Sequence, residues 1–399
     1  MDTIYITGHR NPDTDSVCSA IAYSRLKNTL DPEHPCKPCR AGLLNRETEF
    51  VLNYFQVPDP QLYTDVSPQI RDVDIRRMEG VDGEMSLRRA WITMRDQQID
   101  TLCVVDKERN LKGLITVKDV ATANMDVLDT YILAESETSY QNIVDILDAK
   151  VLVGDITGKK VEGRIVIGSG SAEQMERSIS KGDIVIVANR SESQLTAIEM
   201  GAGCVVVCAG CKVSRTICML AEEQGCMIIS TPNSTYVSGQ MISQAAPIRH
   251  YMVRDDLLTF NLNSSVESAT KVMASVRFRY FPVLDDDGHY IGVVSRRNMM
   301  NLHKKQLILV DRNEKGQAVE GIDQAEILEI IDHHRIGSME TDGPVYFRNV
   351  PVGCTCTIIY QMYRENGVEL DRSTAGLLLS AILSDTLMFR SPTCTPLDE

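Results

Sequence analysis

The sequence lacks any apolar run near 18 residues, the length at which a segment becomes a candidate membrane-spanning helix. Its first residues, MDTIYITG, contain neither the basic region nor the apolar core of a secretory signal. We therefore expect a cytoplasmic protein that makes no membrane contact. In such a protein the 12 cysteines are expected to be reduced thiols.

Positive charge is also scarce. The 399 residues carry 41 Lys and Arg against 55 Asp and Glu, which gives a formal net charge of −14. A chain this acidic is repelled by phosphate backbones and has few counterions to release, so we expect no nucleic-acid partner. With 43% hydrophobic residues the chain is globular and long enough for two to four domains.

An internal repeat divides the chain. Residues 85–120 align without a gap, at a constant offset, with residues 264–299. Each copy has helically spaced apolar residues, then a strand, an Asp turn, a second strand with a glycine near its start and a polar step into another helix. Two copies so far apart exclude a solenoid and indicate one small domain used twice.

Each copy resembles a CBS motif, two of which normally pair into one nucleotide-binding module. The family ending G-h-h-[ST]-x-x-D appears as GLITVKD in the first copy and as GVVSRRN in the second, and the segment RFRYFPV precedes the latter. Carboxylates can bind ribose, arginines phosphate and aromatic rings adenine. The resemblance thus implies nucleotide contacts from Thr116, Asp119, Arg277, Arg279, Tyr280, Phe281, Ser295 and Asn298, the last in place of the usual Asp. A purely structural CBS pair is the alternative.

Between the copies the pattern changes. Short apolar runs such as GRIVIGS, GDIVIVANR and GAGCVVVCAG, bounded by glycines, alternate with helical stretches. This alternation predicts an α/β domain with a largely parallel sheet. By position and pattern the segment resembles the DRTGG-type domain that some CBS proteins carry between their CBS motifs.

The two ends of the chain together read as one doubly wound, parallel-sheet α/β domain. In such sheets ligands bind at the carboxyl ends of the strands. Polar residues follow the predicted strands, and others lie in the turn GHRNPDTDS and at the end of the helix GLLLSAILS. These residues are His9, Asp13, Asp15, Asp311, Asp332, His333, His334 and Asp385.

Carboxylates and imidazoles without cysteine suit Mn²⁺, Mg²⁺ or Co²⁺ better than a thiolate-type zinc site. The set holds more ligands than one metal usually takes from a protein. We therefore expect two metals, about 3.5–4 Å apart, that activate a water for phosphoryl hydrolysis. A structural salt-bridge cluster is the alternative.

Four motifs in chain order, GHRNPDTDS, LVDRNE, DHH and LSDT, resemble the DHH phosphoesterase superfamily. In detail they are similar to family II inorganic pyrophosphatases, in the branch with a CBS–DRTGG–CBS insertion. The resemblance covers essentially the whole chain. It implies two parts of a DHH domain, residues 1–66 and 304–399, two CBS motifs, residues 67–127 and 247–303, and a DRTGG-type domain, residues 128–246.

The resemblance also implies an activity and roles for residues. The substrate would be pyrophosphate accompanied by Mg²⁺, and the enzyme would hold two Mn²⁺ or Co²⁺ ions. His9 and Asp13 would bind the first metal, Asp15, His333 and Asp385 the second, and Asp311 both. His334 would face the substrate, Asp332 would orient a histidine, and Asp15 would accept a proton from the attacking water.

The resemblance further implies a homodimer formed through the CBS pairs. It also implies regulation of this chain by adenine nucleotides, with AMP and ADP inhibiting and ATP or diadenosine polyphosphates activating.

Two departures from the family pattern stand out. Arg312 replaces a histidine of the usual VDHN motif. The substrate-clamping C-terminal domain of the family is not found, so we expect this chain to bind metals and nucleotides but to hydrolyse pyrophosphate weakly. The alternatives are a DHH-type phosphodiesterase or exopolyphosphatase, and a nucleotide sensor without catalysis.

Overall fold

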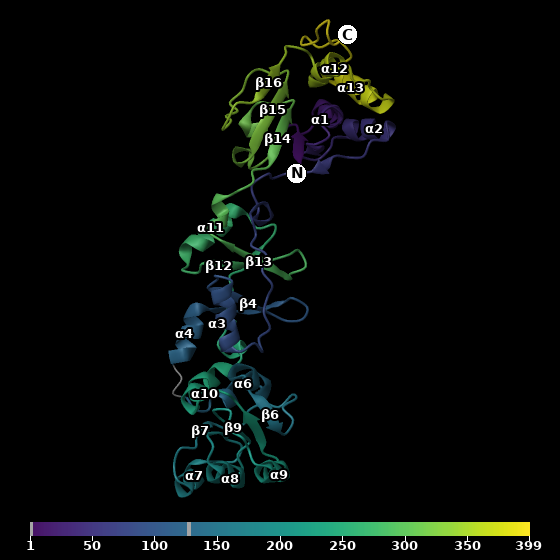
Figure 1. Ribbon diagram of the computed structural model, residues 1–399. Coiled ribbons are helices and arrows are strands. Elements are labelled where there is room, and N and C mark those ends of the chain that lie inside the picture. Colours follow the sequence, from purple (N-terminus) through teal and green to yellow (C-terminus); the bar gives the residue numbers. More distant parts are fainter. Residues whose placement is uncertain (1–2, 126–128) are drawn as a thin grey trace. The chain divides into compact units, whose positions relative to one another are not determined.

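The computed structural model describes residues 3–125 and 129–399 (Figure 1). The chain forms two compact units. Unit 1 comprises Met1–Ile75, Leu262–Arg279 and Ser295–Glu399, and unit 2 comprises Arg76–Asn261 and Tyr280–Val294. The predicted division into five segments is finer than this and stays a prediction. Its boundary between residues 127 and 128 lies outside the described residues.

Unit 1 is built on a six-stranded sheet in the order β16-β15-β14-β1-β2-β3. All of its paired strands run parallel. The strands are β1 (Ile4–Thr7), β2 (Cys36–Arg40), β3 (Gln61–Leu62), β14 (Gln306–Val310), β15 (Glu326–Asp332) and β16 (Tyr346–Asn349). The two ends of the chain therefore share one parallel sheet, which confirms the predicted α/β class.

The strand order reverses between β1 and β14. From β1 the chain moves outward to β2 and β3, and from β14 it moves outward on the other side to β15 and β16. Such a reversal opens a crevice at the carboxyl ends of the two central strands, where ligands of α/β proteins bind. The insertion between β3 and β14 leaves this switch point intact.

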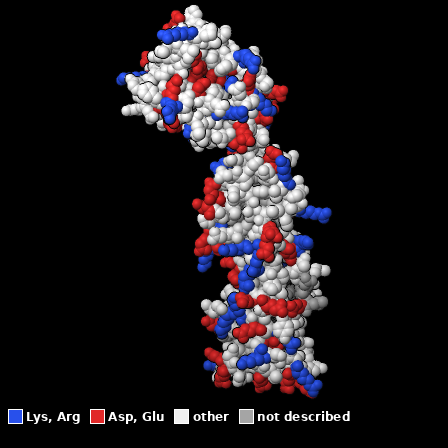
Figure 2. Space-filling model, turned by 180° about the vertical axis from the view of Figure 1, so that it is seen from behind, with Lys and Arg blue, Asp and Glu red and all other residues white. Residues whose placement is uncertain are grey.

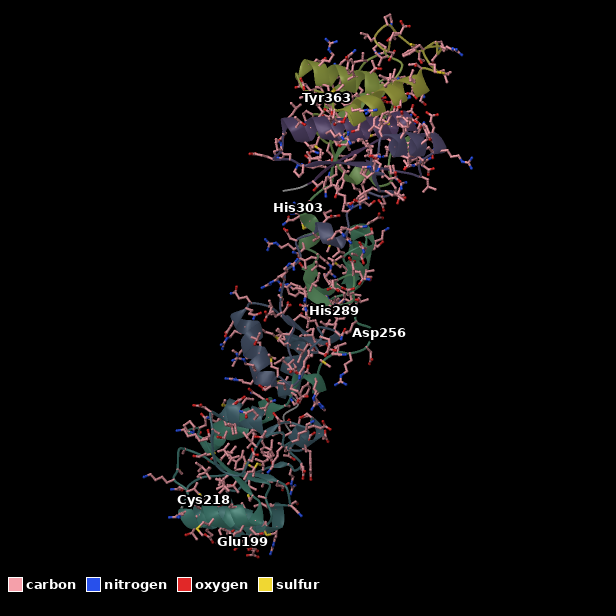
Figure 3. The ribbon with its side chains drawn as sticks, turned by 90° about the vertical axis from the view of Figure 1, so that its right-hand side faces the viewer. Glu199, Cys218, Asp256, His289, His303 and Tyr363 are labelled. Carbon is pink, nitrogen blue, oxygen red and sulfur yellow. The ribbon has the colours of Figure 1, made fainter. Side chains whose placement is uncertain are left out.

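Four helices cover one face of this sheet (Figure 1). They are α1 (Thr14–Leu30), α2 (Arg46–Tyr54), α12 (Thr355–Glu365) and α13 (Arg372–Asp385). Alternate strand residues, including Ile6, Ile308 and Ile331, point into this helical core, as the two-residue period of a strand requires. Tyr363, labelled in Figure 3, joins two of the helices because its hydroxyl donates to the carbonyl of Ala22 at 2.8 Å.

The other face of the sheet is covered by the connection between β14 and β15. Strand residues such as Leu307 and Leu309 pack there against Val319 and Ile322. This connection forms two 3-10 turns, η5 (Lys315–Gln317) and η6 (Ile322–Gln324). Gly321, with φ of 78°, interrupts it in the left-handed region, which favours turns over a longer helix.

Unit 2 contains a five-stranded sheet in the order β6-β10-β9-β8-β7. Only the β6–β10 pair is antiparallel, so the largely parallel sheet predicted here is confirmed. Its strands are β6 (Lys150–Val153), β7 (Ile165–Ile167), β8 (Ile184–Val187), β9 (Cys204–Val207) and β10 (Met227–Ser230). Its helices are α5 (Ile132–Glu135), α6 (Tyr140–Leu147), α7 (Ala172–Ser178), α8 (Ser191–Glu199), α9 (Arg215–Gln224) and α10 (Thr235–Ile242).

The sequence repeat is also a structural repeat. Helix α3 (Leu87–Asp96) corresponds to α11 (Val266–Ser275), β4 (Thr101–Val105) to β12 (Tyr280–Leu284), and β5 (Leu111–Thr116) to β13 (Tyr290–Ser295). Every bound keeps the offset of the sequence alignment. The copies diverge afterwards, into α4 (Val117–Met125) in the first and η4 (Asn298–Met300) in the second. The shorter elements are β11 (Phe260–Asn261), η1 (Ile70–Asp72), η2 (Ser243–Ala245) and η3 (Ile248–His250).

The surface is mixed in charge. Figure 2 shows acidic and basic side chains interspersed over the face in view, without a continuous basic stripe on that face. Within the same residues, no helix has both the length and the apolar character that crossing a bilayer would require.

Candidate metal centre

His9 and Asp311 follow the carboxyl ends of the two central strands, β1 and β14. His9 Nε2 lies 3.5 Å from Asp311 Oδ2 and 3.3 Å from Asp13 Oδ2. The other oxygen of Asp13 accepts a hydrogen bond from Ser16 N at 2.9 Å and caps α1. A Cβ at Gly8 would lie 1.7 Å from Ser16 Oγ, so the turn that delivers His9 needs glycine.

A second group adjoins the first. Ligand atoms of Asp15, His333 and Asp385 lie within 4.8 Å of one another, as do those of His9, Asp13 and Asp311. His333 Nε2 is 3.4 Å from Asp311 Oδ1 and 3.8 Å from Asp385 Oδ2. The structure thus brings all six predicted ligands together as two triads, with Asp311 touching both histidines.

Asp311 is held in an unusual backbone conformation. Its φ is 59°, in the left-handed region that non-glycine residues rarely adopt and that recurs at functional sites. The side chain is buried and also accepts a hydrogen bond from Thr355 Oγ1 at 3.3 Å. The strained conformation turns the carboxylate into the crevice at the end of β14.

Asp15 is fully buried at the start of α1. Its two oxygens accept hydrogen bonds from the backbone N–H groups of Thr355, at 2.6 Å, and Cys356, at 2.9 Å. These are first-turn donors of α12, which have no partner inside their own helix and favour a negative charge. Sequence reasoning missed this support. The GCTCT segment that opens α12 gave no signal, because it has no charged or imidazole side chain.

His333 is oriented for a ligand on one side. Its Nδ1 pairs with the carbonyl of Val352 at 3.0 Å, which leaves Nε2 facing Asp311 and Asp385. Nε2 is buried and has no hydrogen-bond partner. Buried polar nitrogens are nearly always partnered, and ligating histidines commonly use their other nitrogen on a backbone carbonyl. The donor set therefore fits a divalent metal.

His334 is held by Asp332. Asp332 Oδ1 lies 2.8 Å from His334 Nδ1 and also accepts from the backbone N–H groups of His333 and His334. His334 remains 42% exposed, so its Nε2 edge is accessible. Among the described residues, the other four histidines belong to no ligand group that includes a residue of the two triads; two of them, His289 and His303, are labelled in Figure 3.

The imidazoles of the cluster bind protons tightly when no metal is present. Burial alone would lower the pKa of His9, but hydrogen bonds to Asp13 and Asp311 outweigh it and raise the pKa to about 9. For His333, burial is likewise outweighed by Asp311 and Asp15, and the pKa rises to about 10.

The carboxylates divide into two kinds. Burial and then the charge of Asp311 raise the pKa of Asp15 to about 6. Burial and the charges of Asp15 and Asp311 raise the pKa of Asp385 to about 8. For Asp311 burial is outweighed by the imidazoles of His333 and His9, which lie 3.4 and 3.5 Å away and hold its pKa well below the usual range. In the metal-free protein, the imidazoles and the Asp385 carboxyl therefore hold protons that metal ions would have to displace.

The predicted nucleotide residues occupy equivalent places in the two repeat copies. Asp119 Oδ2 accepts from Thr116 N at 2.8 Å and from Thr116 Oγ1 at 2.7 Å. Asn298 Oδ1 accepts from Ser295 N at 2.9 Å and from Ser295 Oγ at 2.5 Å. Asp119 and Asn298 thus make the same local turn, which explains how Asn can replace Asp in the second motif.

The aromatic and arginine residues predicted to bind nucleotide differ in burial. Phe281 is 1% exposed, and its ring packs on Phe260 with centroids 5.6 Å apart. Tyr280 is half-buried, and Arg277 and Arg279 are exposed. The nucleotide contacts of these residues stay a prediction.

The fold and the cluster together define an α/β protein with a candidate two-metal centre at the switch point of its sheet. Comparisons with known proteins agree. The family described as "DHH family, N-terminal domain" matches residues 3–382. The chain is similar to the cobalt-dependent inorganic pyrophosphatase of Clostridium perfringens, with 38% identity over 397 residues, and to a probable manganese-dependent inorganic pyrophosphatase of Thermotoga maritima, with 33% identity over 398 residues. Each alignment covers 100% of this chain and 72% of the relative.

Among solved structures, this chain is similar to the regulatory region of Clostridium perfringens pyrophosphatase. That structure contains the CBS and DRTGG domains complexed with the activator diadenosine tetraphosphate. The identity is 29%, the TM-score is 0.55, and the match covers 57% of this chain and 99% of that one. The chain therefore belongs to the DHH family, within its metal-dependent inorganic pyrophosphatases that carry a CBS–DRTGG region. Both resemblances seen in the sequence are confirmed.

Proposed function

We propose that this protein hydrolyses pyrophosphate to two phosphates with a pair of Mn²⁺ or Co²⁺ ions, the substrate carrying Mg²⁺. The observation that carries the proposal is the pair of adjoining triads that meet at Asp311. The relatives named cobalt- and manganese-dependent inorganic pyrophosphatases support the metals and the substrate.

The residues divide between the two metals. His9 and Asp13 would hold the first, and Asp15, His333 and Asp385 would hold the second. Asp311 would serve both. When bound, two metals supply Lewis acidity and a water that ionises near neutral pH.

Three residues act around the metals. Asp15, buried within the second triad, would be the carboxylate that accepts a proton from the attacking water. His334, fixed by Asp332 through Nδ1, presents Nε2 to the substrate. From that position it polarises a phosphate oxygen or protonates the leaving phosphate.

The CBS–DRTGG region supplies regulation by adenine nucleotides. The similar region of the Clostridium perfringens protein binds diadenosine tetraphosphate as an activator, which supports a nucleotide site here. AMP and ADP inhibit and ATP or diadenosine polyphosphates activate. The protein functions as a homodimer through its CBS pairs.

Phosphate release from pyrophosphate tests the proposal. With Mn²⁺ or Co²⁺ we expect release that Asp311→Asn lowers by a factor on the order of 10² or more, while the exposed control Asp59→Asn leaves it unchanged. Faster cleavage of short RNA or of polyphosphate than of pyrophosphate would contradict the substrate and favour another DHH enzyme. Binding of Mn²⁺ and AMP without hydrolysis of any of these substrates would favour the nucleotide sensor.

A further inference from the structure

A cavity of about 170 Å³ adjoins the candidate metal centre at the same edge of the sheet. It lies within unit 1, between the loops that follow β14 and β15. The lining residues are Arg312, Asn313, Glu314, Gln317, His334 and Arg335. Neither arginine has a part in the metal triads or in the steps proposed above.

The half-buried side chain of Arg312 has no partner at one of its nitrogens. Its Nε is buried without a hydrogen-bond partner. Across the described residues its side chain makes no ion pair with a carboxylate, although it directly follows Asp311. Because buried polar atoms in folded proteins are nearly always satisfied, the unfilled nitrogen points to a ligand beside it.

The cavity carries an excess of positive charge. Arg335 is 87% exposed and lies 2.9 Å from Glu314, the only carboxylate among the lining residues. That pair leaves the charge of Arg312 uncompensated at the cavity wall. This local excess contrasts with the net charge of −14 of the whole chain. Planar guanidinium groups bind phosphate oxygens in pairs, which makes a phosphate the fitting anion.

The walls of the cavity are fixed before any ligand binds. The side chain of buried Asn313 donates to Asp332 and, at 3.0 Å, to the carbonyl of Arg335, and its oxygen accepts from Gly337 N. The same Asp332 holds His334. One network therefore positions both loops, and the cavity is smaller than the about 300–1,000 Å³ of pockets for drug-sized ligands. It suits a single phosphate group.

We propose that Arg312, with Arg335 at the rim, binds one phosphate group of the substrate next to the metals. The proposal rests on the proposed function and deepens it, because it assigns a second anion site to that centre. His334 lines the same cavity, so a phosphate held there meets its Nε2. The subsite favours substrates with two charged phosphate groups over phosphate esters with an uncharged leaving group.

Binding of inorganic phosphate to the Mn²⁺-loaded protein tests the subsite without turnover. In calorimetric titrations Arg312→Gln should weaken phosphate binding at least about tenfold and leave Mn²⁺ affinity unchanged. Arg312→Lys, which keeps the charge but not the planar fork, should fall between. The exposed Arg46→Gln, on α2, is the matched control and should bind phosphate like the parent.

Three results would overturn the subsite. The first is an unchanged phosphate affinity in Arg312→Gln. The second is a parallel loss of Mn²⁺ affinity, which would assign Arg312 to the metal ligands. The third is an equal loss in Arg46→Gln, which would show a general charge effect. A failure of pyrophosphate hydrolysis leaves these binding measurements unaffected, so the two proposals fail separately.

Discussion

Metal binding at the cluster is expected to release protons. Without metal, His9 has a pKa of about 9, His333 of about 10 and Asp385 of about 8. At pH 7 each of the three groups therefore holds nearly a full proton. A metal ion binds only the deprotonated imidazole and carboxylate, so these protons must leave.

The expected release is about three protons per chain when both metals bind at pH 7. Near pH 7 the affinity for the metal pair should then rise by a factor on the order of 10³ per pH unit, more steeply below about pH 6, where Asp15 also holds a proton, and less steeply once Asp385 ionises near pH 8. The sign follows from the raised pKa values. Protonation stabilises the metal-free fold at low pH, and this stabilisation is lost as the pH rises from the ordinary pKa of each group, 3.8 for Asp385 and 6.5 for the histidines, to its raised value of about 8 to about 10.

Titration calorimetry with MnCl₂ at pH 7 measures the number of protons released on metal binding. The observed enthalpy is plotted against the ionisation enthalpy of several buffers, and the slope is the proton count. Asp385→Asn removes one titrating group and should lower the count by about one, whereas the exposed Asp59→Asn should not change it. A slope of zero for the parent would refute the reasoning, since the imidazoles would then already be neutral.

Three further predictions concern stability and nucleotide binding. Asp385→Asn should stabilise the metal-free protein at pH 9 by on the order of 1–3 kcal/mol, because the raised pKa of the carboxyl shows that its ionisation in the folded state is unfavourable. At pH 4 the carboxyl is protonated, and the substitution should have no such effect. Urea unfolding in the presence of a chelator at both pH values checks this. Asp398→Ala should cost about 1–3 kcal/mol and weaken Mn²⁺ binding, because buried Asp398 accepts from Gly353 N at 2.9 Å beside the α12 turn that holds Asp15. Unchanged unfolding and Mn²⁺ titration would contradict it. Arg279→Ala should weaken AMP binding but not Mn²⁺ binding, and calorimetry that finds equal AMP affinity would disprove its role.

Much of the fold could be predicted because its signals are local. The repeat copies preserve every bound of a helix and two strands, so aligning residues 85–120 with residues 264–299 was enough to find them. The ligands lie at the ends of apolar strand runs, where a parallel sheet collects functional groups. The sequence therefore predicts that His9 and Asp311 lie in the same site, although about 300 residues separate them.

The support of the site could not be predicted, because it is made by contacts that leave no local pattern. The backbone N–H groups of Thr355 and Cys356 are identical to any others until α12 packs against Asp15. The left-handed φ of Asp311 likewise has no signature in LVDRNE. Sequence reasoning recognises side-chain chemistry, whereas these devices belong to the backbone.

Those backbone devices explain how three buried or half-buried carboxylates can converge in one crevice. Asp15, Asp311 and Asp385 repel one another, and the repulsion is visible in the pKa of Asp385, raised by burial and by the charges of the other two. The N–H groups of α12 stabilise Asp15, and protonated imidazoles stabilise Asp311. The imidazole of His333, 3.8 Å from Asp385, offsets only part of the burial and repulsion there, so Asp385 binds a proton instead. In the metal-free protein, helix N–H groups and bound protons thus offset the charges of the three carboxylates. A pair of divalent ions would replace the protons, and because metals bind the folded state, their binding would raise the free energy of unfolding.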